Sequence, residues 1–167
     1  MARKVLLLFI CCLLLLPAGC NAPVKVGDAG DKPWDLFTQE EAEAILGFEV
    51  EPEIQKIDSM GQKIVFYGPV SDKETSFIQV SIVRNEEMED SLKEQGYSVK
   101  QFFEETKKAL PESPQTVKGF GDEAFWTSGA LHILAGDVFV TVSTSHSDTP
   151  EALDRAKEVA GIVLDRL

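Results

Sequence analysis

The chain has two histidines, His132 and His146, and histidine is the side chain best suited to proton transfer near neutral pH. His132 lies in an apolar strand-like segment, where alternation points it away from Leu131 and Ile133. His146 belongs to the run Ser145-His146-Ser147-Asp148, but neighbours in sequence cannot fold onto one another as a catalytic triad. We interpret both histidines as non-catalytic, and a metal- or histidine-dependent hydrolase remains the alternative.

Two further segments resemble known ligand-binding motifs. Residues Gly119–Ala124 match the G-x-G-x-x-A pattern, but Phe125-Trp126-Thr127 continue as strand, and a pyrophosphate needs a helix N-terminus there. The acidic run Glu86–Asp90 lacks the alternating oxygen ligands and central glycine of a dedicated calcium loop. We therefore expect no catalytic residue, no metal and no cofactor.

The first residues have the three parts of a secretory signal peptide. Arg3 and Lys4 precede an apolar run from Val5 to Leu16, and small residues follow. The run is shorter than the roughly 20 apolar residues that a membrane-spanning helix needs. Residues 1–19 are thus expected to be removed on export.

The residues around the expected cleavage site, Leu16-Pro17-Ala18-Gly19-Cys20, resemble the lipobox of bacterial lipoproteins. This resemblance implies a diacylglycerol on Cys20, cleavage before it and anchoring to a bacterial membrane through at least two acyl chains. Asn21 at the second mature position resembles the address for the periplasmic face of the outer membrane in Gram-negative hosts. An uncleaved anchor, or an unlipidated signal cut at Ala22, is the alternative.

The composition after the signal describes one acidic domain on a tether. All three cysteines lie in the first twenty residues, so the remainder has no disulfide. The chain has a formal charge of −12, which becomes −14 because residues 1–19 carry two cations and no acid. This charge disfavours nucleic acid as a partner. Residues 20–33 are rich in Gly, Pro, Asp and Ala, typical of a flexible tether, and residues 34–167 can form a single core.

Capping signals predict three helices. Each begins at a hydroxyl residue that can accept from a backbone N–H of the first turn, namely Thr38, Ser98 and Thr149. Gly47 and Pro111 provide stops for the first two. Helices are therefore expected near 38–46, 98–110 and 149–167.

Alternating apolar residues predict strands joined mainly by hairpins. The expected strands are Lys63–Tyr67, Phe77–Val83, Ala124–Thr127, Ala130–Ala135 and Val138–Thr144, with a further strand-like segment at Thr116–Phe120. Ser128-Gly129 and Gly136-Asp137 are two-residue turns between the last three. The main order is α-β-β-α-β-β-β-α, which predicts an α+β fold, an antiparallel sheet with helices packed mainly on one face.

Phe125 and Trp126 are candidate contact residues for a partner. Because adjacent residues of a strand face opposite ways, one of them must point away from the main core unless both sheet faces are covered.

The early pattern of Leu-Phe, a capping threonine and a helix ending in Leu-Gly, with the late run Gly119-Phe-Gly-Asp-Glu-Ala-Phe-Trp126, resembles small exported lipoproteins of unknown function. It is most similar to an uncharacterised lipoprotein family common in actinobacteria, which implies a fold like photosystem II protein P and Mog1. The resemblance implies no catalytic residues. We expect a membrane-anchored, non-catalytic binding or assembly module that contacts an envelope protein or an apolar ligand.

Overall fold

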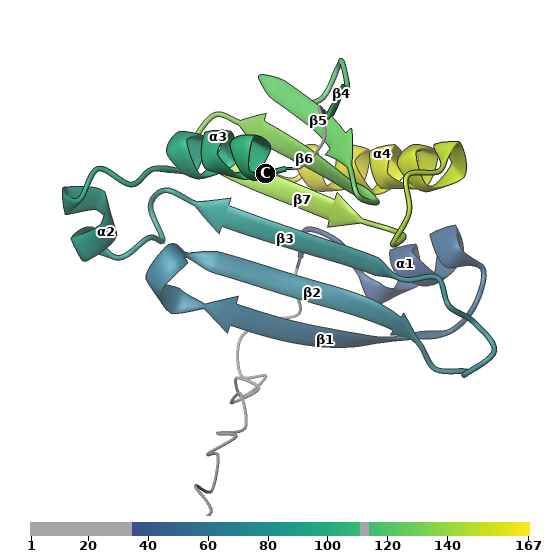
Figure 1. The fold of residues 1–167 in the computed structure, drawn as a ribbon. Helices are drawn as coiled ribbons and strands as arrows, with labels where there is room; N and C mark the ends of the chain where they lie inside the picture. The colour runs from purple at the N-terminus through teal and green to yellow at the C-terminus, as the bar shows by residue number, and fades with distance from the viewer. Residues whose placement is uncertain (1–34, 111–113) are drawn as a thin grey trace, which may run out of the picture.

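The computed structural model describes residues 35–110 and 114–167, which form one seven-stranded antiparallel sheet with helices on both sides (Figure 1). The strand order is β1-β2-β3-β7-β6-β5-β4. In chain order the elements are α1 (Gln39–Leu46), β1 (Val50–Ile57), the 3-10 turn η1 (Asp58–Met60), β2 (Gln62–Pro69), β3 (Ile78–Arg84), α2 (Asp90–Glu94), α3 (Val99–Ala109), β4 (Gln115–Thr116), β5 (Glu123–Thr127), β6 (Ala130–Ala135), β7 (Val138–Ser143) and α4 (Pro150–Leu164).

The predicted α+β class with an antiparallel sheet is confirmed, and the predicted order is wrong in part. Strand β1 and the short α2 were not predicted. Strand β4 is only two residues long, shorter than the strand-like segment predicted at Thr116–Phe120. Strand β1 was not predicted because it is an edge strand with a proline, Pro52, inside it. Only Val50 is buried and Ile54 partly buried, while its other residues are exposed. A strand that is paired on one side and exposed at six of its eight residues carries little of the apolar alternation that identifies strands.

The helices begin where their capping residues predict. Thr38 and Glu41 form a complete capping box on α1, with the Glu41 backbone N 3.3 Å from the Thr38 Oγ1 and the Thr38 backbone N 2.9 Å from the Glu41 carboxylate. Ser98 and Thr149 accept from the backbone N–H groups of Gln101 and Ala152 at the starts of α3 and α4. Local hydrogen bonding therefore sets these three helix starts.

Each face of the sheet has its own core. Helices α1 and α4 pack on one face, where residues such as Val65, Val140 and Ala156 are fully buried. Helix α3 packs on the opposite face through Val99 and Phe103. The expectation of helices mainly on one face therefore needs correction, because α3 covers part of the second face.

Several predictions concern residues outside those that the structure describes. These are the signal peptide at 1–19, the lipid on Cys20 and the tether at 20–33. Among the described residues, no helix combines the length and the hydropathy required to cross a membrane.

Candidate functional site

His132 is held on β6 as a neutral, partly buried side chain. Its ring stacks on Phe125, with centroids 4.7 Å apart, and its Nδ1 lies 3.2 Å from the Thr141 hydroxyl oxygen. Burial lowers the pKa of His132 to about 4. Leu131 and Ile133 are fully buried on the other face, as alternation predicts. The His132 ring is thus packed against Phe125 and hydrogen-bonded to the Thr141 hydroxyl group.

The residues around His146 do not form a catalytic chain. The His146 ring lies 4.8 Å from the ring of Phe77. The Asp148 Oδ1 accepts from the Gly129 backbone N–H at 2.6 Å, and Ser145 and Ser147 bond to each other at 3.1 Å. The Ser, His and Asp side chains therefore contact different neighbours. Within residues 35–110 and 114–167, no group of three or more His, Cys, Asp or Glu side chains could hold a metal ion.

The glycine motif at residues 119–124 leads into a strand, not a helix. Residues 119–122 form bends and β5 begins at Glu123, while the Asp122 side chain accepts from the Gly136 backbone N–H at 2.8 Å. No helix N-terminus follows the glycines here, so the segment has no geometry for a pyrophosphate.

Phe125 and Trp126 point to opposite faces, as predicted, but both are buried. Phe125 is 1 % exposed under α3, and Trp126 is 4 % exposed in the core with α1 and α4. Because both faces are covered at β5, the premise for a contact residue at either position does not hold.

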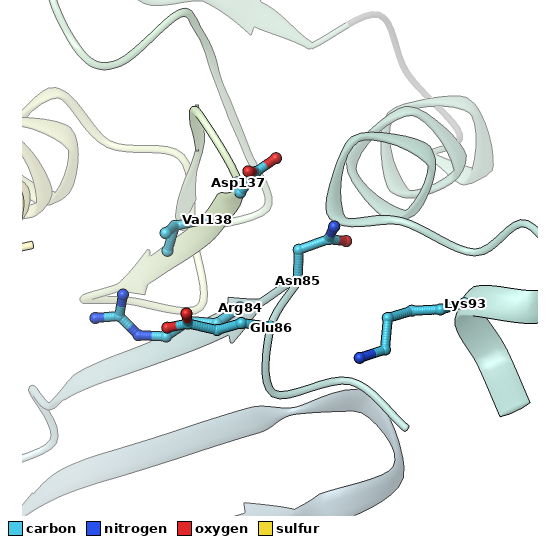
Figure 2. Close-up of a pocket in the computed structure, with 6 residues that line it drawn as sticks. All are labelled: Arg84, Asn85, Glu86, Lys93, Asp137 and Val138. Carbon is cyan, nitrogen blue, oxygen red and sulfur yellow. The ribbon is translucent and has the colours of Figure 1, made fainter. Parts of the chain in front are cut away.

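A polar pocket of about 360 Å³ lies where β3 ends beside the β6–β7 turn (Figure 2). Its lining contains both signs of charge and is made by Arg84, Asn85, Glu86, Lys93, Asp137 and Val138. Asn85 is fixed there, since its Oδ1 accepts from the Val99 backbone N–H at 3.2 Å, and Lys93 is paired with Asp90 at 2.8 Å. Among these lining residues no nucleophile is paired with a base, and the groups they present are polar and charged.

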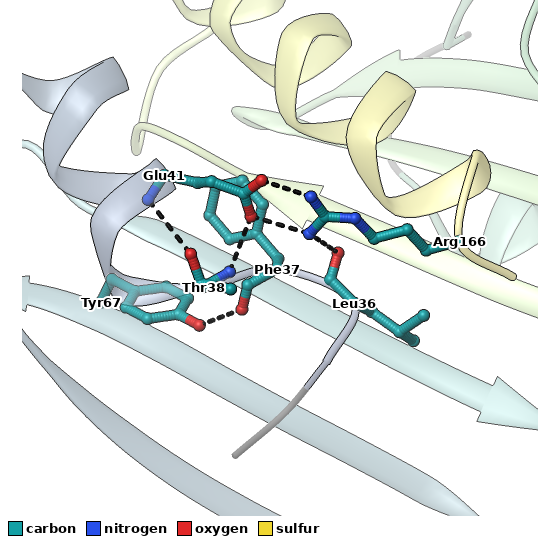
Figure 3. Close-up of polar contacts among 6 residues, drawn as sticks. All are labelled: Leu36, Phe37, Thr38, Glu41, Tyr67 and Arg166. Atoms are coloured by element: carbon teal, nitrogen blue, oxygen red, sulfur yellow. Dashed lines mark hydrogen bonds and ion pairs between the residues drawn. The ribbon is translucent and has the colours of Figure 1, made fainter.

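A second polar cluster ties the two ends of the domain together (Figure 3). Arg166 donates to both carboxylate oxygens of Glu41, at 2.9 and 2.5 Å, and to the Leu36 carbonyl at 3.3 Å. The Arg166 guanidinium holds the pKa of Glu41 below its usual value. The Tyr67 hydroxyl donates to the Phe37 carbonyl, and burial raises the pKa of Tyr67. These bonds hold α1 against the end of α4, which is a structural role.

One half of the sheet face on which α3 lies has no described helix over it. In Figure 1, α3 lies over β6 and β7, and among the described residues no helix lies over β1, β2 and β3 on that side. The strand register places the following residues of β1, β2 and β3 on this surface, which we call the open face: Glu51, Glu53, Gln55, Gln62, Ile64, Phe66, Gln79 and the buried Ser81. Thr141 and Ser143 of the neighbouring β7 continue it.

The open face is polar at its centre and aromatic at one end. Gln62 donates to the Ser81 hydroxyl at 2.8 Å. At the far end the rings of Phe66 and Phe77 lie 5.3 Å apart. Phe66 and Ile64 are only partly buried, although they alternate with the buried Val65 on the other face. A surface of amides, hydroxyls and the partly exposed side chains of Ile64 and Phe66 has the mixed composition of a protein-binding surface.

The open face was not predicted from the sequence as a candidate binding surface. In β2, residues on both faces are apolar, so the alternation does not distinguish the uncovered side from the core side. The sequence does contain an indication of this face. Polar residues occupy alternate positions of two central strands, Gln79 and Ser81 in β3 and Thr141 and Ser143 in β7. Such residues in central strands indicate a face without a helix above it.

The environment of His132 predicts a specific pH dependence of stability. Its pKa of about 4 in the folded state lies below the ordinary value of 6.5, so between those values the unfolded chain binds more protons. Stability is therefore complete above pH 6.5 and is lost as the pH falls toward 4. Lowering the pH from 7 to 5 is expected to cost about 2 kcal/mol through this residue.

Urea unfolding at pH 7 and pH 5 measures this contribution. His132→Gln, which does not titrate, is expected to lose about 2 kcal/mol less than the wild type over this interval. His146→Gln, in an exposed loop, is the control for replacing a histidine elsewhere in the domain. An unchanged dependence in His132→Gln would contradict the assignment.

Comparison with known proteins found no matching family model, no similar curated protein and no similar solved structure.

Proposed function

We propose that this protein is an exported bacterial lipoprotein, anchored to the envelope through Cys20, that acts as a non-catalytic binding or assembly module. Its open face is the surface that contacts a partner protein. The observation that carries the proposal is the half of the sheet that no described helix covers. A broad sheet face with partly exposed apolar side chains among amides and hydroxyls suits a protein surface better than a small molecule, which needs a concave site.

The position of the first described residues supports this arrangement. Phe37 is fully buried on the side of α1 and α4, where its ring lies 5.6 Å from Tyr67. The chain thus enters the domain on the side opposite the open face. The tether predicted at residues 20–33 would give the domain room to turn the open face toward a partner.

Site-specific photocrosslinking in intact envelopes of the host tests the proposal. The photoreactive amino acid p-benzoylphenylalanine replaces Gln55 or Gln79 on the open face, and Glu158 on α4 as the control. We expect one recurring product from both open-face positions and no such product from Glu158, which is exposed on the opposite side.

The same experiment with Cys20→Ser tests the anchor. We expect this variant to incorporate no radiolabelled palmitate and to lose the crosslinked product, because it leaves the membrane. Palmitate label in Cys20→Ser would overturn the lipidation site. A product obtained only from Glu158 would overturn the open face as the contact surface.

A further inference from the structure

The charged groups of β1, β2 and β3 are sorted between the two sides of the sheet. On the open face these strands carry the carboxylates of Glu51 and Glu53 and no cation. Their cations, Lys56, Lys63 and Arg84, lie by register on the opposite side. Strand alternation alone produces this separation, since the two acids occupy odd positions of β1 and Lys56 an even one.

The two acids lie beside the aromatic end of the open face. Glu53 is directly opposite Phe66 in the β1–β2 pairing, and Glu51 is opposite Gly68. Cross-strand partners are about 5 Å apart at their Cβ atoms. Both carboxylates are solvent-exposed, and the next strand adds Gln79, the cross-strand neighbour of Phe66.

This arrangement matches the chemistry of a lysine or arginine side chain. The aliphatic part of such a side chain can lie against the Phe66 ring, and its charged end can reach Glu51 and Glu53. The Gln79 amide can accept a further hydrogen bond from it. A carboxylate or phosphate group would instead meet two like charges at this edge.

We infer that the partner of the open face is a protein that presents lysine or arginine side chains to the β1 edge, where Glu51, Glu53 and Phe66 receive them. This inference rests on the proposed function and specifies the chemistry of the partner. It also accounts for the open face having acids only, in a chain that carries cations on the other side of the same strands.

Binding of a fluorescently labelled hexalysine peptide to the protein purified in detergent tests the inference by fluorescence anisotropy. Glu51→Gln/Glu53→Gln is expected to weaken binding about five- to tenfold at low salt. Glu151→Gln/Glu158→Gln on α4 removes the same amount of charge from exposed positions and is expected to change it less than twofold.

Equal weakening by the two double variants would overturn the inference, because binding would then follow net charge alone. The photocrosslinking experiment separates this failure from a failure of the proposed function. If the product from Gln79 persists in Glu51→Gln/Glu53→Gln and at high salt, the open face binds a partner and the basic chemistry is wrong. If Gln55 and Gln79 give no product, the proposed function itself fails.

Discussion

Replacing Phe103 with alanine is expected to lower the free energy of unfolding by about 3–5 kcal/mol. Phe103 is fully buried, and its ring lies 5.2 Å from Phe125 and 5.4 Å from Phe139. The substitution leaves a cavity between α3 and the sheet, and it removes the main contact that holds the helix there. Since a domain is typically stable by only about 5–15 kcal/mol, this is a large fraction of the total.

Urea unfolding followed by tryptophan fluorescence in a Trp34→Phe background measures the loss. Trp126, the tryptophan that remains, is buried in β5 next to Phe125. Phe102→Ala is the matched control. Phe102 is only partly buried, with its ring 5.6 Å from Phe139, so its loss should be roughly half as large. Equal losses for the two variants would show that α3 is not held mainly through Phe103.

Gly129→Ala is expected to destabilise the protein by about 2–5 kcal/mol, much more than Gly136→Ala at about 1–2 kcal/mol. Both glycines lie in two-residue hairpin turns and have positive φ, +73° for Gly129 and +56° for Gly136. That conformation alone costs an alanine about 1–2 kcal/mol. Of these two glycines, Gly136 has open space around an added Cβ, whereas a Cβ at Gly129 would lie 2.1 Å from the Ser145 carbonyl oxygen.

The clash at Gly129 has to be relieved by moving the loop that leads into α4. The Gly129 backbone N–H donates to Asp148, and its carbonyl accepts from the Thr144 N–H at 3.3 Å. Thermal unfolding of the two variants side by side measures the difference. Similar melting temperatures for Gly129→Ala and Gly136→Ala would mean that the loop at 145–148 yields without cost.

The sequence predicted the local features of the fold because short-range chemistry specifies them. The capping box at Thr38, the cap at Ser98 and the turn at Ser128-Gly129 all depend on residues within a few positions of one another. The missing element, β1, depends on pairing with β2, and its own sequence of glutamates, a proline and a lysine is atypical of a strand.

The open face was harder to predict, because it is a sheet surface that is distinguished only by having no described helix over it. The placement of Phe125 and Trp126 on opposite faces followed from alternation, yet whether a helix lay over each face did not. Both side chains are buried, so neither is left uncovered, and the contact role predicted for them stays untested. The open face lies mainly on β1, β2 and β3, on the other side of β7.

By itself, the sequence determined the α+β class, the helix starts, the hairpin turns and the absence of cysteine after residue 20. It also predicts export and a lipid on Cys20, from residues that lie outside the described part of the chain. Only the tertiary structure decided that α3 lies on the face opposite α1 and α4, and that no described helix covers β1–β3 on the side of α3. The reason is physical: capping and alternation act between neighbours in the chain, whereas covering a sheet face depends on side chains that are distant in sequence, such as Phe103 and Phe139.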